Sequence, residues 1–484
     1  MNPTFPDQLW IHGQPRREAS GGRIEIIEPA TEVLLATVPA AGPREVDEAV
    51  GGAAEAFRNS GWAVPSPKRR GEVLRDIAQR IRAQAEELAT LEARNVGKPI
   101  DDARWEINAG ARCFDYYAHL ASQPSGETIP VANGGLDYTL RVPVGVVAAI
   151  VPWNFPFLMA AWKVGPALAA GCSVVLKPAS LTPLTALALG KIAHEAGIPA
   201  GVFSVIAGRG DQIGDHLVSH AQVRKIAFTG ETVTGARILR LAADDIKRVS
   251  LELGGKSPNV IFADADIEAA AAAAPSAVFG NTGQDCCARS RIFVERPAYA
   301  KFLEAFVEAT KKQVIGDPLN AKTQIGPLVS AKQRQRTEQY VEYAKEEGGR
   351  IVYGGTRPTE KGYYLTPAIV DGLANSSRVC REEIFGPLAC VIPFDGEQEA
   401  IALANDTIYG LSGSLWTRDV ERALRVGRAL ECGVLSVNTN SSVFQEAPFG
   451  GFKQSGVGRD LGVEAFRQYT ELKNIFVRVP GWES

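Results

Sequence analysis

The sequence of 484 residues predicts an α/β protein with a doubly wound parallel sheet domain, a second α/β domain and a small β arm. Three observations predict this organisation. Short β-branched runs alternate with helical segments from 144 to 254, the alternation restarts after Gly254, and an isolated extended segment follows the Gly- and Pro-rich residues 448–458. We therefore expect the first domain over 1–123 and 144–254, the second over 255–453, and the arm over 124–143 and 454–484.

The first 120 or so residues are expected to be mainly helical. Apolar residues recur at three-to-four spacing over 44–59 and 68–95, and the Gly-Lys-Pro sequence at 97–99 ends the second helix. A polar hairpin is expected over 128–141, with its turn at Asn133-Gly134-Gly135.

Strands and helices alternate through the rest of the chain. In the first domain we expect strands at 144–151, 173–177, 202–206 and 225–229, and helices at 157–170, 183–196 and 232–242. In the second domain we expect strands at 258–262 and 291–294, and helices at 267–279 and 297–314. The terminal segment 469–479 has the pattern of an exposed strand, and such a strand usually pairs, which predicts an oligomer.

Composition excludes several classes of protein. Hydrophobic residues make up 45% and charged residues 22%, which is ordinary for a globular protein, and the net charge of −3 provides no basic surface for nucleic acid. The longest apolar runs, 144–151 and 269–274, are much shorter than the ~20 residues of a membrane helix. Residues 1–10 contain no cationic segment followed by an apolar one, so we expect a cytoplasmic protein without nucleic-acid or membrane partners.

Cysteine and histidine usage argues against a disulfide framework and against a metal site. The seven cysteines are an odd number and include no Cys-x-x-Cys pair, and among the five histidines only His216 and His220 are four residues apart. We expect reduced thiols, most of them buried, and no bound metal.

Two glycine-rich segments fall short of nucleotide-binding motifs, and a third is a better candidate. Residues 254–257 (GGKS) lack the earlier glycine of a P-loop, because position 250 is Ser250, and residues 208–214 miss the G-x-G-x-x-G spacing by one residue. Residues 228–235 (FTGETVTG) form a strand, a glycine turn and a helix start, where free backbone N–H groups can bind a pyrophosphate. A tight turn with a threonine cap is the alternative.

Three residues are suited to nucleophilic catalysis. Cys286 follows Gly-Gln-Asp on an expected irregular loop, where a thiol can attack a carbonyl carbon. Glu252 lies among apolar residues after a strand, and burial there raises a carboxyl pKa toward the range of a general base. Asn154 stands between Pro152 and Pro156, whose fixed φ angles can hold its amide as an oxyanion donor. An inert thiol, a surface carboxylate and a structural turn are the respective alternatives.

Together and in this order, these motifs resemble those of the aldehyde dehydrogenase superfamily, in its NAD(P)⁺-dependent hydrolytic branch. The matching segments span nearly the whole chain: 152–156 (PWNFP), 177–178 (KP), 228–235, 251–255 (LELGG), 283–286 (GQDC), 383–387 (EIFGP) and 448–451 (PFGG). The resemblance implies a Rossmann-like dinucleotide-binding domain, a catalytic domain and an oligomerisation arm. It also implies oxidation of an aldehyde to a carboxylic acid through a thioester on the cysteine.

The resemblance implies roles for the matching residues. Cys286 would attack the aldehyde, Asn154 and the backbone N–H of Cys286 would hold the oxyanion, and Glu252 would activate the hydrolytic water, with Lys163 on a proton path. Lys177 and Glu383 would bind the two riboses of NAD or NADP, and Phe385 would pack beside the nicotinamide. The other implied cofactor residues are Ile150, Pro152, Trp153, Ser180, Arg209, Gly210, Phe228, Gly230, Glu231, Gly235 and Leu253.

Three positions depart from the family's pattern. Ser180 replaces a glutamate that binds the ribose hydroxyls in many NAD⁺-preferring members, which removes repulsion of a 2′-phosphate, and Arg209 is a candidate partner for that phosphate. We therefore expect NADP⁺ to be accepted, and the preference between the two cofactors stays open. Asp460 replaces a glutamate of the proton path, and Glu231 replaces a small hydroxyl residue beside the pyrophosphate.

The implied substrate tunnel is largely aromatic. It maps onto Phe155, Met159, Trp162, Asp285, Cys287, Phe444 and Phe449. Such a lining suits a neutral or amphipathic aldehyde, and Asp285 beside the nucleophile favours an amino-aldehyde over a carboxylate-bearing one unless its side chain turns away. Gly280 stands where succinic-semialdehyde relatives often place an arginine, which also disfavours a dicarboxylic semialdehyde.

Three other functions are weighed against this one. A semialdehyde dehydrogenase for carboxylate-bearing substrates conflicts with Asp285. The CoA-acylating branch usually lacks a base at the position of Glu252, and a catalytically silent homologue would not need Cys286, Glu252 and Asn154 together. The expected partners are a small aldehyde and further copies of the chain, in a homodimer or homotetramer.

Overall fold

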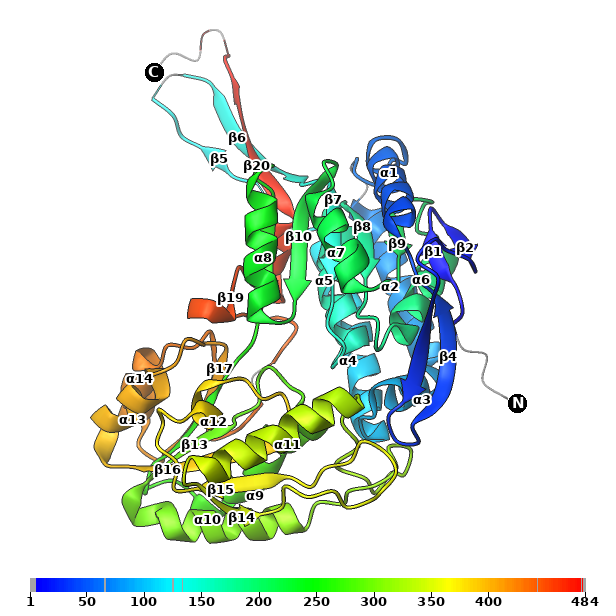
Figure 1. The fold of residues 1–484 in the computed structure, drawn as a ribbon. Coiled ribbons are helices and arrows are strands. Elements are labelled where there is room, and N and C mark those ends of the chain that lie inside the picture. The colour runs from blue at the N-terminus through cyan, green and yellow to red at the C-terminus, as the bar shows by residue number, and fades with distance from the viewer. Residues whose placement is uncertain are drawn as a thin grey trace.

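Two large sheets form the body of the molecule, and a smaller third sheet projects from it (Figure 1). The computed structural model describes residues 6–64, 67–123, 126–132, 134–441, 443–479 and 481. Asn133 of the predicted hairpin turn lies outside these residues.

The first sheet has eight strands in the order β19-β11-β10-β7-β8-β9-β1-β2. Their bounds are β1 (Leu9–Ile11), β2 (Gln14–Arg16), β7 (Val146–Ile150), β8 (Ser173–Lys177), β9 (Phe203–Val205), β10 (Val223–Thr229), β11 (Arg248–Glu252) and β19 (Gly456–Val457). The five strands from β11 to β9 are parallel, and β7 and β8 are buried along their whole length, as expected for a sheet covered on both faces. The chain runs from β7 to β9 in one direction and then returns to place β10 on the other side of β7. The strand order therefore reverses between β7 and β10, and ligands of such sheets bind at that edge.

Helices cover both faces of the first sheet. They are α1 (Pro43–Asn59), α2 (Pro67–Ala83), α3 (Ala85–Val96), α4 (Ile100–Leu120), α5 (Pro156–Ala170), α6 (Leu184–Glu195), α7 (Gly210–Ser219) and α8 (Thr232–Ala243). The single helix predicted at 68–95 is two helices, because the backbone of Gln84 leaves the helical range between α2 and α3. Gly97 ends α3 with a left-handed φ of 93°, so the predicted stop at this glycine is confirmed.

The second sheet has seven strands in the order β14-β15-β16-β13-β12-β17-β18. Their bounds are β12 (Pro258–Ile261), β13 (Arg291–Glu295), β14 (Arg350–Tyr353), β15 (Ala368–Asp371), β16 (Leu388–Phe394), β17 (Ser412–Trp416) and β18 (Val434–Val437). All neighbours pair in parallel except β14 and β15. The covering elements are α9 (Ile267–Phe279), η1 (Gly280–Gly283), α10 (Arg296–Lys311), α11 (Ala331–Glu346), α12 (Arg378–Arg381), α13 (Gly396–Asn405) and α14 (Val420–Ala429).

The arm is a three-stranded antiparallel sheet. It consists of β5 (Thr128–Ile129), β6 (Leu136–Pro143) and β20 (Thr470–Val477), in the order β20-β6-β5. The exposed terminal strand predicted at 469–479 pairs with β6 of the same arm along its whole length. The arm projects well beyond the body in Figure 1.

Two features of the fold depart from the predicted organisation. Four strands precede α1, including the hairpin of β3 (Arg23–Glu28) and β4 (Val33–Pro39), where mainly helices were expected. Within the segment assigned to the arm, β19 pairs with β11 and α15 (Gly462–Gln468) packs against α5, so this part belongs with the first sheet. The remaining domain boundaries stay a proposal.

None of the helices in the described part of the chain has the length and apolar character needed to cross a bilayer.

Candidate active site

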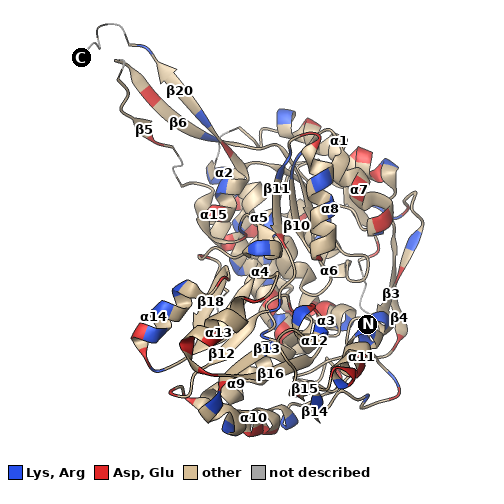
Figure 2. Cartoon of the chain, turned by 60° about the vertical axis from the view of Figure 1, so that its left-hand side comes forward, with Lys and Arg blue, Asp and Glu red and all other residues tan. Residues whose placement is uncertain are grey.

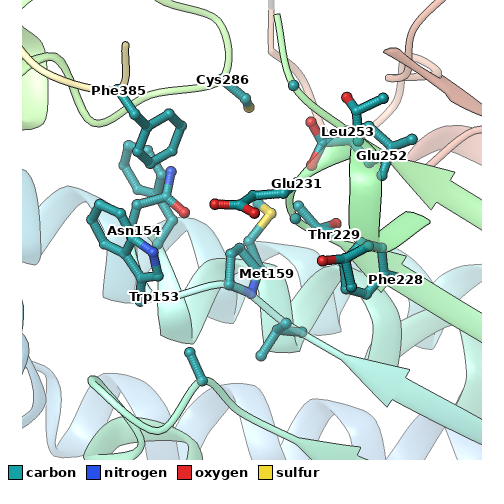
Figure 3. A pocket seen from close by; sticks show the side chains of 18 of the residues that line it. Trp153, Asn154, Met159, Phe228, Thr229, Glu231, Glu252, Leu253, Cys286 and Phe385 are labelled. Atoms are coloured by element: carbon teal, nitrogen blue, oxygen red, sulfur yellow. The ribbon is translucent and has the colours of Figure 1, made fainter. Parts of the chain in front are cut away.

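A single continuous cavity of about 1070 Å³ runs along the carboxyl ends of β7, β8 and β10 and is closed by loops of the second sheet. Every predicted site residue lines it except Lys163, Arg209, Gly235 and Phe444. Figure 3 shows Cys286, Glu252 and Asn154 around one space within this cavity. Its size exceeds that of an ordinary small-molecule pocket and suits a dinucleotide together with a small substrate.

The loop that carries Cys286 is held in an unusual backbone conformation. Asn281, Thr282 and Gly283 have successive positive φ values of 49°, 57° and 70°. Left-handed conformations of non-glycine residues cost about 1–3 kcal/mol each and persist only where surrounding contacts fix them. Here Thr282 donates to the carbonyl of Gly326 at 2.9 Å, and a Cβ on Gly283 would lie 2.3 Å from the carbonyl oxygen of Gly386. The loop therefore stores strain that positions Cys286.

The Cys286 thiol needs a base. Its sulfur, the Cys287 sulfur and an Asp285 carboxylate oxygen lie within 4.8 Å of one another. The Cys287 thiol, burial and the nearby carboxylates of Glu252 and Asp285 raise the pKa of Cys286 well above its usual value. The sulfur is consequently protonated at rest, and attack on a carbonyl carbon requires that another group remove the proton.

Glu252 is suited to remove it. It ends β11 with a buried side chain, and neither carboxylate oxygen has a hydrogen-bond partner among the described residues. Burial raises the pKa of Glu252 to about 7, against the opposing effect of the Lys163 charge. A carboxyl group with this pKa exchanges protons readily at neutral pH.

Asn154 lies in the loop between β7 and α5, and its side chain is buried. Its amide nitrogen donates to the carbonyl of Gln284 at 2.9 Å, which ties it to the nucleophile loop. A primary amide carries two N–H groups, so one remains available for an oxyanion.

Lys163 lies behind the cavity wall. Its ammonium group is 2.8 Å from the carboxylate of Asp460, and both side chains are buried. The aspartate therefore still reaches the lysine despite being one methylene shorter than the glutamate of relatives.

Predicted cofactor residues occupy two regions of the cavity. Lys177 is the last residue of β8 and Ser180 follows this strand, and burial lowers the pKa of Lys177 to about 8. Residues 228–230 lie where β10 meets the start of α8. Gly235 lies behind the residues of the cavity wall and packs against Leu253. A Cβ added at Gly235 would lie 2.6 Å from the Leu253 side chain.

The predicted phosphate partner is misplaced. Arg209 is the exposed N-cap of α7 and does not line the cavity, whereas Asp211 and Asp215 of the same helix do. Asp215 is paired with Arg237 of α8. Neither aspartate was predicted, because α7 was not predicted, although their four-residue spacing after β9 would have placed them on one helical face.

Glu383 and Phe385 form the opposite wall. A Glu383 carboxylate oxygen accepts from the backbone N–H of Gly255 at 3.1 Å, and burial raises the pKa of Glu383 to about 7. Phe385 has a left-handed φ of 62°, and its ring meets Trp153 edge-on at 5.1 Å between centroids. The two loops that follow β7 and α12 thus converge on one apolar surface.

The substrate side of the cavity is mainly aromatic. Phe155, Met159, Trp162, Phe449, Asp285 and Cys287 line it, and the rings of Trp162 and Phe449 meet edge-on at 5.1 Å. Phe444 was predicted there but does not line the cavity and is 53% exposed. Trp105 on α4 lines the mouth and was missed; a tryptophan on the polar side of an amphipathic helix was the available signal.

These residues fit a dinucleotide. The Thr229 hydroxyl is buried without a partner among the described residues, at the edge where the strand order reverses. Space is open beside Gly210 and Gly214, since a Cβ added at either would meet no atom within 4 Å. The cavity therefore offers a backbone cradle and unsatisfied donors along its length.

Comparisons with known proteins give a consistent result. The model of the aldehyde dehydrogenase family matches residues 16–475. The peroxisomal aminoaldehyde dehydrogenase 2 of Malus domestica is 42% identical over 97% of this chain and 95% of its own length. The betaine aldehyde dehydrogenase of Bacillus subtilis is 40% identical, over 98% of this chain and 96% of its own. The solved NAD⁺ complex of an aldehyde dehydrogenase from Bacillus cereus superposes with a TM-score of 0.96 at 41% identity, covering 98% of this chain and 96% of that one.

Proposed function

This chain belongs to the aldehyde dehydrogenase family, and on that premise we propose that Cys286, Glu252 and Asn154 oxidise an amino-aldehyde to its carboxylic acid. The observation that carries the proposal is the meeting of a protonated thiol and an unpartnered carboxyl group in one cavity. The enzyme uses NAD(P)⁺.

The first chemical step is nucleophilic addition. Glu252 accepts the thiol proton, directly or through a water molecule, and the sulfur of Cys286 bonds to the aldehyde carbon. Negative charge then develops on the aldehyde oxygen. The free N–H of Asn154 and the backbone N–H of Cys286 stabilise that charge.

The cofactor residues hold an oxidant against this adduct. When bound, NAD(P)⁺ supplies the acceptor for the hydride that leaves the substrate carbon. Lys177 and Glu383 line the cavity and would bind its riboses, and the contacting rings of Phe385 and Trp153 would exclude water from the nicotinamide region.

Hydrolysis completes the reaction. After Glu252 has released the thiol proton to solvent, it removes a proton from water and the hydroxyl oxygen adds to the thioester carbon. The sulfur of Cys286 then leaves as a thiolate and regains a proton from Glu252, which restores the resting site. Because this base is present, turnover should not require CoA.

The substrate class follows from charge and shape. Asp285 lines the cavity close to the reactive sulfur, and the aromatic rings of Phe155, Trp162 and Phe449 face the same space. A cationic amino group is attracted by a carboxylate and by aromatic faces, whereas a second carboxylate is repelled. The names of two relatives, an aminoaldehyde and a betaine aldehyde dehydrogenase, agree with this class.

A substrate comparison tests the proposal. NAD(P)H formation is followed without CoA for 4-aminobutyraldehyde, hexanal, benzaldehyde and succinic semialdehyde, with the native chain and with Asp285→Asn. We expect 4-aminobutyraldehyde to have the highest kcat/KM and Asp285→Asn to lower that value about tenfold, with hexanal affected less. Fastest turnover of succinic semialdehyde, or a strict need for CoA, would contradict the proposal.

We also propose that the arm joins copies of this chain into a homodimer or homotetramer. The side chains of Leu140, Leu472 and Phe476 are exposed on its strands, and β20 forms an edge of the arm's sheet. In the view of Figure 2, charged residues of both signs are dispersed over the body. A cytoplasmic location remains a prediction.

A further inference from the structure

A buried cluster of Glu92, Lys98 and Glu106 lies behind the loop that carries Asn154. Glu92 comes from α3, Glu106 from α4, and Lys98 from the connection between them. All three side chains are fully buried, and none of them lines the cavity. The chemistry described above gives the cluster no role.

Lys98 holds the backbone of the oxyanion residue. Its ammonium group donates to the carbonyl oxygen of Asn154 at 2.8 Å, is paired with the carboxylate of Glu106, and lies 4.1 Å from the centre of the Phe155 ring. The same carbonyl also accepts from the side chain of Asn281 at 2.9 Å. One carbonyl group is thus fixed by a buried cation and by the nucleophile loop.

The two carboxyl groups fix the next segment. Glu106 accepts from the backbone N–H of Leu158 at 3.0 Å, and Glu92 accepts from that of Phe157 at 3.4 Å. These N–H groups belong to the first turn of α5, whose N-cap residue provides no side-chain acceptor. The cluster therefore caps α5 from outside and fixes the chain from the carbonyl of Asn154 to Leu158.

Stability alone does not explain such a cluster. A buried ion pair is often no more stabilising than apolar residues of the same size, because both charges lose their hydration. Burial and the Glu106 charge raise the pKa of Glu92 well above its usual value, which favours the neutral form of the Glu92 carboxyl group. Beyond stability, the ion pair of Lys98 and Glu106 fixes the position of the ammonium group that donates to the Asn154 carbonyl.

We propose that Lys98 is a positioning residue, which orients Asn154 so that its free N–H points to the developing oxyanion. The inference rests on the proposed function. Since Lys98 acts through Asn154, its loss should slow only the reactions that form an oxyanion.

Three assays on the full-length protein separate this role from a general structural one. They are aldehyde oxidation, hydrolysis of p-nitrophenyl acetate without nucleotide, and alkylation of Cys286 by iodoacetamide. In Lys98→Met we expect kcat of the first two reactions to fall together by about tenfold to a hundredfold, as for other groups that orient catalytic residues. Alkylation, which forms no oxyanion, and the Kd for NAD⁺ should stay within about twofold.

Lys247→Met is the matched control. Lys247 is also buried and donates to two backbone carbonyls, those of Val218 and His220. It precedes the amino end of β11, whereas the site lies at the carboxyl end of this strand. Its replacement should leave the ratio of ester hydrolysis to alkylation unchanged. An equal fall of that ratio in both variants would contradict the proposal.

A double variant covers the case in which Lys98→Met does not fold. Lys98→Met with Glu106→Gln removes both charges and keeps an acceptor for Leu158. A native melting temperature with ester hydrolysis still reduced supports positioning by Lys98. Recovery of native rates together with the melting temperature would show that the cluster only stabilises the fold. Absence of aldehyde oxidation in the native protein would contradict the proposed function, whereas the ester and alkylation assays would still decide the role of Lys98.

Discussion

At the scale of single residues, the reactivity of the site depends on the missing hydrogen bonds of Glu252. A carboxylate usually finds donors when it is buried, and both oxygens of this one have none among the described residues. Burial raises its pKa to about 7, against the opposing effects of the Lys163 charge and of the nearby Cys286 thiol and Thr229 hydroxyl. The pKa of the Cys286 thiol is raised as well. One proton can therefore move between the sulfur of Cys286 and a carboxylate oxygen of Glu252.

The pH dependence of activity should report this carboxyl group. Only its ionised form accepts a proton, so kcat/KM for the aldehyde should rise with pH and level off above a midpoint of about 7. Glu252→Gln should remove this dependence and lower kcat by about a hundredfold or more. A pH profile recorded at saturating cofactor checks both, and a profile unchanged in Glu252→Gln would assign the base elsewhere.

Cofactor preference should depend on Asp211. Its carboxylate lines the cavity, and its charge raises the pKa of Lys177, against the larger effect of burial. Asp211 therefore supplies a negative charge near Ser180, which itself carries none. We now expect NAD⁺ to be preferred, because a 2′-phosphate would meet this negative charge while Arg209 stays outside the cavity. Asp211→Asn should tighten NADP⁺ binding about tenfold, with little change for NAD⁺, as measured by isothermal titration.

The control for that measurement is Glu25→Gln. This substitution removes an exposed charge on β3, which belongs to a different sheet from β8. NADP⁺ bound more tightly than NAD⁺ by the native protein would contradict the expectation.

At the scale of elements, the residues of the buried strands carry most of the predictive signal. The strand at 173–177 and the helix at 267–279 have the predicted bounds, because continuous β-branched or apolar runs with clear ends leave little alternative. The short strands before α1 were missed, since three residues such as those of β2, all exposed, have no periodicity. Likewise, the sequence around Cys286 indicated a nucleophile, but the left-handed backbone of Asn281 and Thr282 depends on contacts with distant loops.

The strained loop before Cys286 gives a testable consequence. Gly283→Ala introduces a Cβ at a positive φ and 2.3 Å from the Gly386 carbonyl oxygen, so both strain and collision should displace the loop. We expect a loss of about 2–3 kcal/mol in the free energy of unfolding and at least about a tenfold loss of kcat. Gly348→Ala, also at positive φ but with nothing within 4 Å of the added Cβ, should cost stability without affecting kcat. Denaturant titration and initial rates distinguish the two variants, and full activity in Gly283→Ala would show that the loop tolerates movement.

At the scale of the whole molecule, the two large sheets meet around one cavity and the arm projects away from them. The motifs predicted their order along the chain, but the arm's pairing of β6 with β20 joins segments more than 300 residues apart, which local patterns do not reveal. The same limit explains Phe444 and Arg209, whose chain positions suit the site although their side chains lie outside its wall.

Association should depend on the apolar face of the arm. The double variant Leu472→Asp with Phe476→Asp places charges on β20, where both native side chains are exposed, and should shift the protein to monomers in light scattering. Leu319→Asp, which also replaces an exposed leucine but lies outside the arm, is the control. Unchanged mass in the β20 variant would remove the arm from the interface.

The base and the nucleophile come from opposite sides of the boundary between the two sheets. Glu252 ends β11 of the first sheet, whereas Cys286 lies among the elements of the second. The two segments are in close contact, because a Cβ added at Gly255 would lie 2.3 Å from the carbonyl oxygen of Cys286. A nascent chain that ends before Cys286 holds the proton acceptor without the thiol, and a fragment that begins after Glu252 holds the thiol without its acceptor. Neither piece has a complete active site, so the chemistry begins only when both sheets have docked.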